Sequence, residues 1–461
     1  MKLRPGLLAT VAMLCIAAGT GRGQYVEDSV EVPGGWVGSL TYNSRADVVY
    51  GTSEIANAVF AIYCPTNIMF RRLAANHAHC VVYDSIDNKA YASFGSYGEE
   101  SLRVIDGQNH IITGGLSVPG ANQLVWESTR DRLYVTCSSE NRIAVVDCAS
   151  DSVTERIAVG VGPGVLHLNT RRGKLYVQNY DDATVSIIDL ATNQVIRTIQ
   201  VGGYPNAGYY APHADKYYCA SSQADDAIAV IDGQSDSIVA RVPIMFGGAV
   251  DAIGGSDATD LVLAEAYNGP TQVYAIDAKA DTLISTLDVS SVIYSIVCGP
   301  TTGYLYCAET DSDSILVVDP FSALVVNTLA VGDAPFVLLP VPVHGRMYVG
   351  HLNSDMVYVI RDSSTGVAES GGADRPMRSG LVASPNPFTQ SVAVVWNSPI
   401  KEGHAARVYA QDGRLVKQAQ IPAGEVRWVW DGRDDIGAAL PPGVYVIEAG
   451  PGLRAKVVKL K

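Results

Sequence analysis

The residues that could do chemistry are scattered along the chain and form no linear catalytic motif. The sequence lacks Gly-x-Ser-x-Gly, His-Glu-x-x-His, Cys-x-x-Cys-His and Walker-type patterns. Its eight histidines are spread along the chain, with His77 and His79 sharing one corner. Any site must therefore be assembled by the fold, and the sequence predicts no individual catalytic or cofactor-binding residue.

Two kinds of residue are candidates for a metal. His213 and His344 both lie in turns at equivalent places of a repeat described below, so a repeat fold could bring them to one face. Acidic pairs occur in other turns, at Asp181-Asp182, Asp225-Asp226 and Asp311 with Asp313. Calcium favours such carboxylates, but none of these pairs has EF-hand spacing or a closing Glu. We expect solvated turn residues and no cofactor, with calcium or another divalent metal as the alternative.

Composition and charge limit the classes of protein and partner. The chain has 461 residues, 48% of them hydrophobic and 17% charged, which is enough to bury a large core. Its formal net charge is −14 at pH 7. A surface this acidic repels nucleic acid and anionic lipid, so we expect neither as a partner.

The first residues favour secretion. Lys2 and Arg4 precede the apolar run GLLATVAMLCIAAG, and small residues follow up to Gly23, which is the layout of a signal peptide spanning 1–23. No later stretch reaches the roughly 20 apolar residues of a membrane span. We therefore expect a secreted or bacterial cell-surface protein without an integral membrane span.

The cysteines do not indicate a disulfide scaffold. Seven cysteines follow the predicted signal peptide, and they are scattered through segments with strand character. Cys137 and Cys148 flank one predicted hairpin and could pair in an oxidising compartment. Buried small apolar side chains are the interpretation that we favour.

A sequence unit recurs through most of the chain. Apolar runs such as IAVVD and VSIID align at Cys64, Asp106, Asp147, Asp189, Asp232, Asp277, Asp319 and Arg361, at intervals of 41 to 45 residues. Each unit contains four short runs rich in Val, Ile and Tyr, separated by turn residues. The Tyr residues recur at fixed strand positions, for example Tyr134 and Tyr176, and are predicted to be core.

The Asp that closes the second run suits an Asx turn, in which its carboxylate accepts a backbone N–H two residues on. We therefore predict a structural role in the repeat turns rather than a catalytic one. The residues concerned are Asp106, Asp147, Asp189, Asp232, Asp277 and Asp319.

Four strands per unit of about 40–45 residues are typical of a β-propeller. The units give eight four-stranded blades, with seven as the alternative if one degenerate unit is miscounted. The chain is expected to begin with the outer half of one blade and to end with the inner half of another, so that pairing of these halves closes the ring. The fold class is therefore all-β.

The repeat resembles a known family. LYVTC (Leu133 to Cys137), LYVQN (Leu175 to Asn179) and MYVG (Met347 to Gly350), each followed by a turn and a strand, resemble YVTN-type β-propeller repeats of secreted and surface-layer-like proteins. The resemblance implies a propeller over 24–362. It assigns no functional residue, because the motif belongs to the hydrophobic skeleton.

A second small domain follows a linker. Residues 363–380 are rich in Ser, Gly and Pro, and six or seven strand-like runs over 381–461 are enough for an Ig-like sandwich. The ordered motifs SPNPF, GRLV, WDGR and GVY resemble the C-terminal sorting domains of type IX secretion cargo and the Ig-like domain of flagellar hook-capping proteins. The resemblance implies contact with secretion machinery and export or anchoring, and the alternative is a passive spacer.

The sequence thus favours a secreted or surface propeller that serves as a binding or structural module, with a protein or glycan at the cell surface as its partner. The alternative is a lactonase-like hydrolase or another small-substrate enzyme. An enzyme would need His, Asp or Glu side chains with shifted pKa values clustered at the mouth of the channel.

Overall fold

The structure is a computed structural model, and two compact units divide the chain at Ala368/Glu369. It describes residues 23–94, 102–221, 227–244, 249–256, 259–267, 271–363, 381–384, 391–396, 404–410, 414–422, 427–449 and 454–459. Apart from two single-turn 3-10 helices, η1 (Ser138–Glu140) and η2 (Pro342–His344), the regular elements of these residues are all strands. None of the helices in these ranges has the length and apolar character to cross a membrane.

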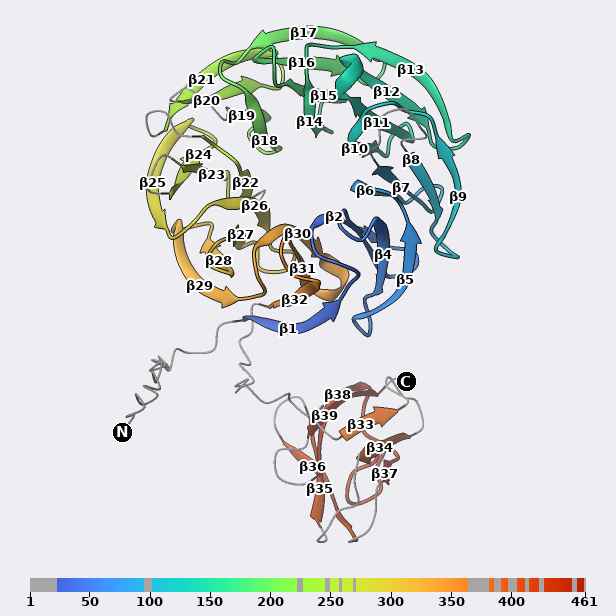
Figure 1. Cartoon of the computed structure of the whole chain (residues 1–461). Coiled ribbons are helices and arrows are strands. Elements are labelled where there is room, and N and C mark those ends of the chain that lie inside the picture. The colour runs from blue at the N-terminus through green and yellow to red at the C-terminus, as the bar shows by residue number, and fades with distance from the viewer. Residues whose placement is uncertain are drawn as a thin grey trace, which may run out of the picture. The chain divides into compact units, whose positions relative to one another are not determined.

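The first unit is a β-propeller with eight blades (Figure 1). In the described residues, β1 to β32 form eight four-stranded antiparallel sheets arranged around a central axis. Blades 1 to 7 are β2–β5, β6–β9, β10–β13, β14–β17, β18–β21, β22–β25 and β26–β29, and blade 8 combines β30–β32 with β1. Of the two blade counts left open by the sequence, eight is confirmed.

The strands of each blade are named here by their order from the axis. The inner strands are β2 (Val37–Asn43), β6 (Ala78–Asp84), β10 (Ala121–Glu127), β14 (Pro163–Asn169), β18 (Pro205–Ala211), β22 (Ile253–Ser256), β26 (Ile293–Cys298) and β30 (Pro335–Val341). The second strands are β3 (Val48–Ser53), β7 (Lys89–Phe94), β11 (Arg132–Cys137), β15 (Lys174–Asn179), β19 (Lys216–Ser221), β23 (Leu261–Tyr267), β27 (Leu305–Glu309) and β31 (Arg346–His351).

The third strands are β4 (Ala58–Tyr63), β8 (Leu102–Asp106), β12 (Arg142–Asp147), β16 (Thr184–Asp189), β20 (Ala227–Asp232), β24 (Thr271–Asp277), β28 (Ser314–Asp319) and β32 (Met356–Asp362). The outer strands are β5 (Ile68–Ala74), β9 (Ile111–Leu116), β13 (Ser152–Ala158), β17 (Gln194–Gln200), β21 (Ser237–Pro243), β25 (Thr282–Val289), β29 (Leu324–Ala330) and β1 (Gln24–Glu31).

Blade 8 closes the ring, because it joins the two ends of the propeller. The first strand, β1, pairs antiparallel with β32, from Gln24 opposite Asp362 to Glu31 opposite Met356. Inner strand β2 contacts inner strand β30, as neighbouring inner strands do around the ring. The N-terminus therefore supplies one outer strand and the C-terminal end supplies three. The sequence predicted that each end of the propeller supplies half of the closing blade. That prediction is wrong, because the fourth run of each sequence unit is the inner strand of the following blade.

The antiparallel order places the connections on two opposite faces. The hairpin face is formed by the inner-to-second and third-to-outer turns. The crossover face is formed by the second-to-third turns and by the crossovers that lead from each outer strand to the next inner strand. These two names are used below.

The core lies between neighbouring blades. The second and third strands are buried on both of their faces, which explains their continuous apolar runs. Between blades 3 and 4, for example, Tyr134, Val145 and Ile157 pack against Leu175 and Val177. The outer strands alternate between exposed and partly buried residues, because only one side faces a neighbour.

The six predicted Asp turns lie on the hairpin face, each at the end of a third strand. The carboxylates of Asp106, Asp189 and Asp232 accept backbone N–H groups two and three residues on, over 2.6 to 3.2 Å. Asp277 does the same, Asp319 accepts from Phe321, and Asp147 accepts from Ser150 three residues on.

Strand register places Tyr63 at the equivalent position of the first blade, because Tyr63 lies opposite Val48 as Asp147 lies opposite Arg132. The alignment of the repeat at Cys64 is therefore shifted by one residue, and Tyr63 is the position equivalent to Asp147.

Each Asp turn ends in a residue of left-handed conformation, and in all of these turns except the one that ends at Ala323 that residue contacts a side chain of the preceding blade. The hydroxyl of Tyr91 donates to Asp151 over 2.6 Å, and that of Tyr134 donates to Asn193 over 2.9 Å. Further such contacts join Tyr50 to His110, Tyr218 to Asp281 and Tyr348 to Asn67, over 2.6 to 2.9 Å. The periodic tyrosines are therefore buried rings whose hydroxyl groups lock one blade to the next.

The second unit is a small sandwich of two sheets. One sheet has the order β33-β34-β37 and the other β36-β35-β38-β39. Its core joins Trp430, which is 1% exposed, to Val394 and Tyr445. The strands are β33 (Leu381–Ser384), β34 (Val392–Trp396), β35 (His404–Ala410), β36 (Leu415–Ile421), β37 (Arg427–Trp430), β38 (Gly443–Ala449) and β39 (Arg454–Lys459).

Candidate functional site

The crossover face is built from loops that are hydrogen-bonded to one another. The N–H of Trp36, in the crossover to blade 1, donates to the carbonyl of Leu352 in blade 8 over 2.8 Å. In blades 4 and 7, carboxylates of second-to-third turns accept N–H groups of crossovers: Asp182 from Val161 and Asp313 from Ala334. Two of the acidic pairs that suggested calcium thus have carboxylates engaged in fixing loops. The third pair, Asp225-Asp226, lies outside the described residues.

Exposed aromatic side chains lie on the crossover face in several blades. Tyr180 and Tyr204 come from a turn and the adjacent crossover, and their rings stack with centroids 5.0 Å apart. Tyr294 lies near the start of inner strand β26, and its ring contacts that of Phe336 on β30. Trp36 and Tyr267 also belong to this face, and they are 46% and 47% exposed. The rigid loops therefore present flat apolar surfaces to solvent.

A carboxyl pair lies at the crossover end of blade 6. Glu265, on second strand β23, is fully buried, and its Oε2 accepts the backbone N–H of Asp251 over 3.2 Å. Asp251 lies two residues before inner strand β22 and accepts the side-chain N–H of Asn206 over 3.3 Å. Glu265 Oε1 has no hydrogen-bond partner within the described protein. Burial, aided by the charge of Asp251, raises the pKa of Glu265 to about 8, so the group is protonated at neutral pH.

Further polar atoms at the crossover ends of other blades also lack partners in the described protein. They are Asn179 Oδ1 at the end of β15, Asn206 Oδ1 on β18 and His351 Nε2 at the end of β31. His351 is fully buried, and burial lowers its pKa to about 4, so the imidazole is neutral. Buried polar atoms without partners are costly in a folded protein. A bound ligand or solvent would supply the missing hydrogen bonds.

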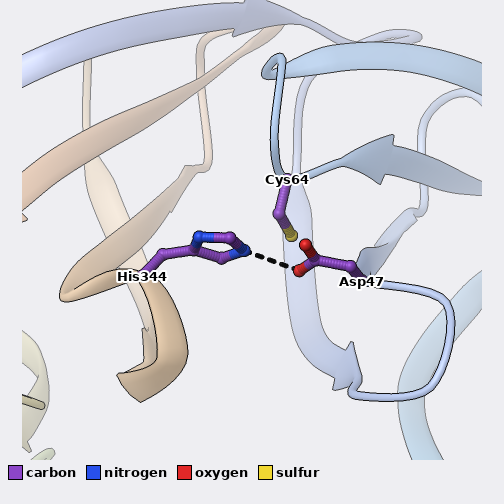
Figure 2. A group of neighbouring side chains, drawn as sticks. All are labelled: Asp47, Cys64 and His344. Atoms are coloured by element: carbon purple, nitrogen blue, oxygen red, sulfur yellow. Dashed lines mark hydrogen bonds and ion pairs between the residues drawn. The ribbon is translucent and has the colours of Figure 1, made fainter. Parts of the chain in front are cut away.

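The predicted metal candidates have different surroundings from each other. His213 is exposed in the inner-to-second turn of blade 5, and the metal-type groups found among the described residues do not include it. His344, in η2 of blade 8, lies against blade 1 (Figure 2). Its Nε2 is 2.7 Å from Asp47 Oδ1, and Cys64 Sγ points toward the same carboxylate.

The group of Asp47, Cys64 and His344 is hydrogen-bonded without a metal. Asp47 Oδ1 also accepts the hydroxyl of Tyr42 over 2.8 Å. Burial raises the pKa of the Cys64 thiol to about 12, so the thiol is neutral and a poor nucleophile. A Cys-His nucleophile pair is therefore not supported here, and the cluster works as a joint between blades 8 and 1.

A second group of the same design joins blades 2 and 3. It contains Asp84, Asp131 and Cys148, with one potential ligand atom of each lying within 4.8 Å of the others. Asp131 and Cys148 are the counterparts in blade 3 of Asp47 and Cys64 in blade 1, because register pairs Arg132 with Asp147 and Val48 with Tyr63. The seven cysteines of the described residues are all free, so Cys137 and Cys148 form no disulfide.

Sequence reasoning missed Glu265, Asp251 and Asp84. Glu265 lies in the run LVLAEAY, where a charge interrupts an otherwise apolar buried strand, and that interruption was a usable signal. Asp84 occupies an inner-strand position at which blades 1 and 4 have Asn43 and Asn169. Only the register of the strands makes this equivalence visible.

Comparison with known proteins supports the fold alone. No protein-family model matches the chain, and no curated protein matches it. Among solved structures, the computationally designed Ika8 protein is similar, with a TM-score of 0.58 and 12% sequence identity. The match covers 73% of this chain and 99% of the designed protein.

Proposed function

We propose that this protein is a secreted or cell-surface binding module whose ligand is held on the crossover face. The observation that carries the proposal is the presence of exposed aromatic rings in several blades of that face, among them Trp36, Tyr180, Tyr204 and Tyr294. Large rings with few rotatable bonds bind ligands at low entropic cost, and tyrosine adds a polar hydroxyl. The rigid loops beneath these rings favour a preformed site.

The chemistry of the face favours a glycan or a protein segment without excess negative charge. The rings offer apolar surfaces for stacking, and Asp181, Asp311 and Asp333 lie in the surrounding turns and crossovers. The chain as a whole is acidic, with a net charge of −14. An anionic ligand would be repelled, whereas a neutral sugar or a basic peptide would not.

Export and attachment belong to the same proposal. Residues 1–23 act as a signal peptide, and 381–461 act as an Ig-like sorting or anchoring domain that contacts secretion machinery. The motifs of the tail and its sandwich of two sheets support this assignment. The test is the intact mass of protein released from the cell surface. A chain that ends near residue 380 supports sorting with cleavage, whereas an uncut tail in non-surface material contradicts it.

Binding is tested with the full-length mature protein on a glycan array and on a panel of basic and neutral peptides. We expect Trp36→Ala and Tyr204→Ala to weaken binding at least about tenfold, as central aromatic contacts do. Phe321→Ala is the matched control, since Phe321 is an aromatic residue that is 84% exposed on the hairpin face. Equal loss in the control, or no loss in the two crossover variants, would contradict the proposal.

A second candidate function is a small-substrate enzyme, such as a lactonase-like hydrolase. The pair formed by Glu265 and Asp251 favours it, because a carboxyl with a pKa of about 8 can donate a proton at neutral pH. A panel of lactones and esters assayed with wild-type protein and Glu265→Gln tests this function. Turnover that disappears in the variant supports the enzyme, and no turnover in the wild type supports the binding module.

A further inference from the structure

Asp84 stands out among the buried polar groups of the hairpin face. Its side chain is completely buried at the end of inner strand β6. Oδ1 accepts the N–H groups of Ile86 and Asp87 over 2.7 and 3.2 Å, which fixes the carboxyl group in place. Oδ2 has no hydrogen-bond partner in the described protein, and it belongs to the group that contains Asp131 and Cys148.

Two other blades show one way of satisfying this position, whereas blade 3 has Glu127, whose carboxylate caps the same turn. Asn43 and Asn169 occupy it in blades 1 and 4, and their Oδ1 atoms cap the same turn. Their Nδ2 groups donate hydrogen bonds, to the carbonyl of Gly107 over 2.9 Å and to the hydroxyl of Tyr176 over 3.2 Å. Asp84 has an acceptor where these blades have a donor. The missing positive partner must therefore be a proton or a cation.

The charges around Asp84 favour a cation. Asp131 and Asp87 lie close enough to affect its carboxyl, and burial is the main cause that raises its pKa. The nearby ammonium of Lys89 is already engaged, by the carbonyl of Cys148 over 2.8 Å and by Asp151 over 3.0 Å. The acidic groups thus outnumber the basic one at this joint.

The donor set selects the class of cation. Two carboxylate oxygens and one sulfur suit zinc, which takes both kinds of ligand, whereas calcium and magnesium prefer oxygen alone. Cys148 is fully buried, and burial raises the pKa of its thiol to about 12. Metal binding would release that proton to solvent and leave a thiolate ligand.

From this geometry we propose that Asp84, Asp131 and Cys148 bind a divalent cation of the zinc class at the joint between blades 2 and 3. Asp131 is partly exposed, so water can complete the coordination from its side. The cation joins a ligand of blade 2 to two ligands of blade 3, as hydrogen bonds do at the other joints. The proposal does not depend on what the crossover face binds.

The pseudo-equivalent group of Figure 2 is a natural control. There Asp47 has two partners, Tyr42 and His344, whereas within the described protein Asp131 accepts from Trp126 alone, over 3.0 Å. The cations Arg346 and Arg361 share a single carboxylate, Glu27, near the first of these joints. That joint has its positive partners within the protein. It should therefore bind zinc much more weakly than the joint of blades 2 and 3.

The experiment is a titration of the full-length mature protein, stripped of metal by a chelator, with Co²⁺ followed by Zn²⁺. We expect one equivalent of Co²⁺ to give the near-ultraviolet absorption of a cobalt–thiolate bond, and Zn²⁺ to displace it and raise the melting temperature. Asp84→Asn and Cys148→Ala should each lower the affinity at least about tenfold. Asp84→Asn installs the residue of blades 1 and 4, so it should fold, which circular dichroism checks.

Cys64→Ala is the matched variant in the group of Figure 2, and it should leave cobalt binding unchanged. Loss of the absorption band in Cys64→Ala with retention in Asp84→Asn would place the metal at the other joint and overturn the proposal. A wild-type protein that gives no band and no melting shift with Zn²⁺ would also overturn it. Asp84 would then hold a proton.

Discussion

The hairpin face and the crossover face of the propeller use their polar groups in opposite ways. On the hairpin face, Lys216 and Tyr218 of blade 5 both bind Asp281 of blade 6 over 2.7 Å, and similar contacts recur around the ring. On the crossover face, Glu265 and His351 are buried with side-chain atoms that have no partner within the described protein. Most polar groups of the hairpin face hold the blades together, with Asp84 as the exception described above, whereas the crossover face has several buried polar atoms without a partner in the described protein.

The difference follows from what the two kinds of turn require. A third-to-outer turn needs an Asx cap and a left-handed residue four positions on, as at Asp232 and Asp236, and both can be supplied by polar side chains. The same residues then meet the next blade, so the geometry repeats. A crossover only has to span two blades, and its sequence is free to vary. Variation, and with it recognition, is therefore expected on the crossover face.

The largest predicted effect comes from breaking a blade-to-blade lock. Asp281→Ala leaves the ammonium of Lys216 and the hydroxyl of Tyr218 without their carboxylate, and the side chains of Lys216 and Asp281 are only 15% and 12% exposed. We expect the free energy of unfolding to fall by about 3–5 kcal/mol. Chemical denaturation of the full-length protein measures it.

Two control variants separate the loss of the contact between blades from the effect of any substitution in this turn. Asp281→Asn keeps an acceptor for tyrosine, as Asn193 does for Tyr134, and should lose less than Asp281→Ala. Lys279→Ala removes a lysine that is 80% exposed and paired with Asp260, and should change stability by less than about 0.5 kcal/mol. Equal effects in all three variants would mean that the contact of Asp281 contributes no more to stability than an exposed ion pair does.

The next prediction is a gain in stability, and it concerns Glu265 at the crossover end of blade 6. The pKa of Glu265 is about 8 in the folded protein and near 4.5 when unfolded, so the folded state binds the proton more tightly. Stability is therefore undiminished below about pH 4.5 and falls as the pH rises toward 8, because folding must then take up a proton or bury a charge. Glu265→Gln should be more stable than the wild type at pH 8.5.

We expect that gain to be about 2–4 kcal/mol at pH 8.5 and to shrink toward zero near pH 4.5. Denaturation of both proteins across this pH range measures the difference. Glu448→Gln, in the second unit, serves as the control, since Glu448 pairs with a partly exposed Arg407. A difference that does not vary with pH would show that Glu265 is ionised in the folded protein.

The fold was largely accessible from the sequence, because the repeat carries it. A period of 41–45 residues with four strand-like runs gives the ring and the number of blades. The sequence did not show where one blade ends and the next begins. In a periodic sequence, a crossover between blades looks like a hairpin turn within a blade. The closure by β1 alone depends on which strands pair with each other, and the apolar runs of the sequence do not show that.

The candidate sites were much less accessible, for a physical reason. Asp84, Asp131 and Cys148 are brought together only because neighbouring blades meet, and their separation in sequence has no fixed value that a motif could express. The pairing of His213 with His344 was proposed from turn positions, yet His344 lies beside Asp47 of the adjacent blade. The sequence shows which residue types are present, but the position of each blade in the ring decides which side chains lie next to one another.

A milder test of the locks concerns hydroxyl groups alone. Tyr134→Phe keeps the buried ring but leaves Asn193 Oδ1 without its 2.9 Å hydrogen bond. We expect a loss of about 1–2 kcal/mol in unfolding free energy. Tyr445→Phe is the counterpart in the second unit, where the hydroxyl donates to Pro441 within the same chain segment and joins no blades. If Tyr134→Phe lowers the free energy of unfolding and Tyr445→Phe does not lower the thermal stability of the second unit, the hydroxyl of Tyr134 stabilises the contact between blades.

The smallest predicted effect on stability lies on the crossover face, and it completes the comparison. Tyr180 is 40% exposed and its ring stacks on that of Tyr204, so Tyr180→Ala should change the free energy of unfolding by less than about 0.5 kcal/mol. Denaturation measures this beside Tyr134→Phe, which alters a buried tyrosine. If Tyr180→Ala costs as much as Tyr134→Phe, the aromatic rings are part of the structural frame and their exposure does not indicate a ligand. If stability is unchanged while binding is lost, the rings are retained for recognition, because the fold gains almost nothing from them.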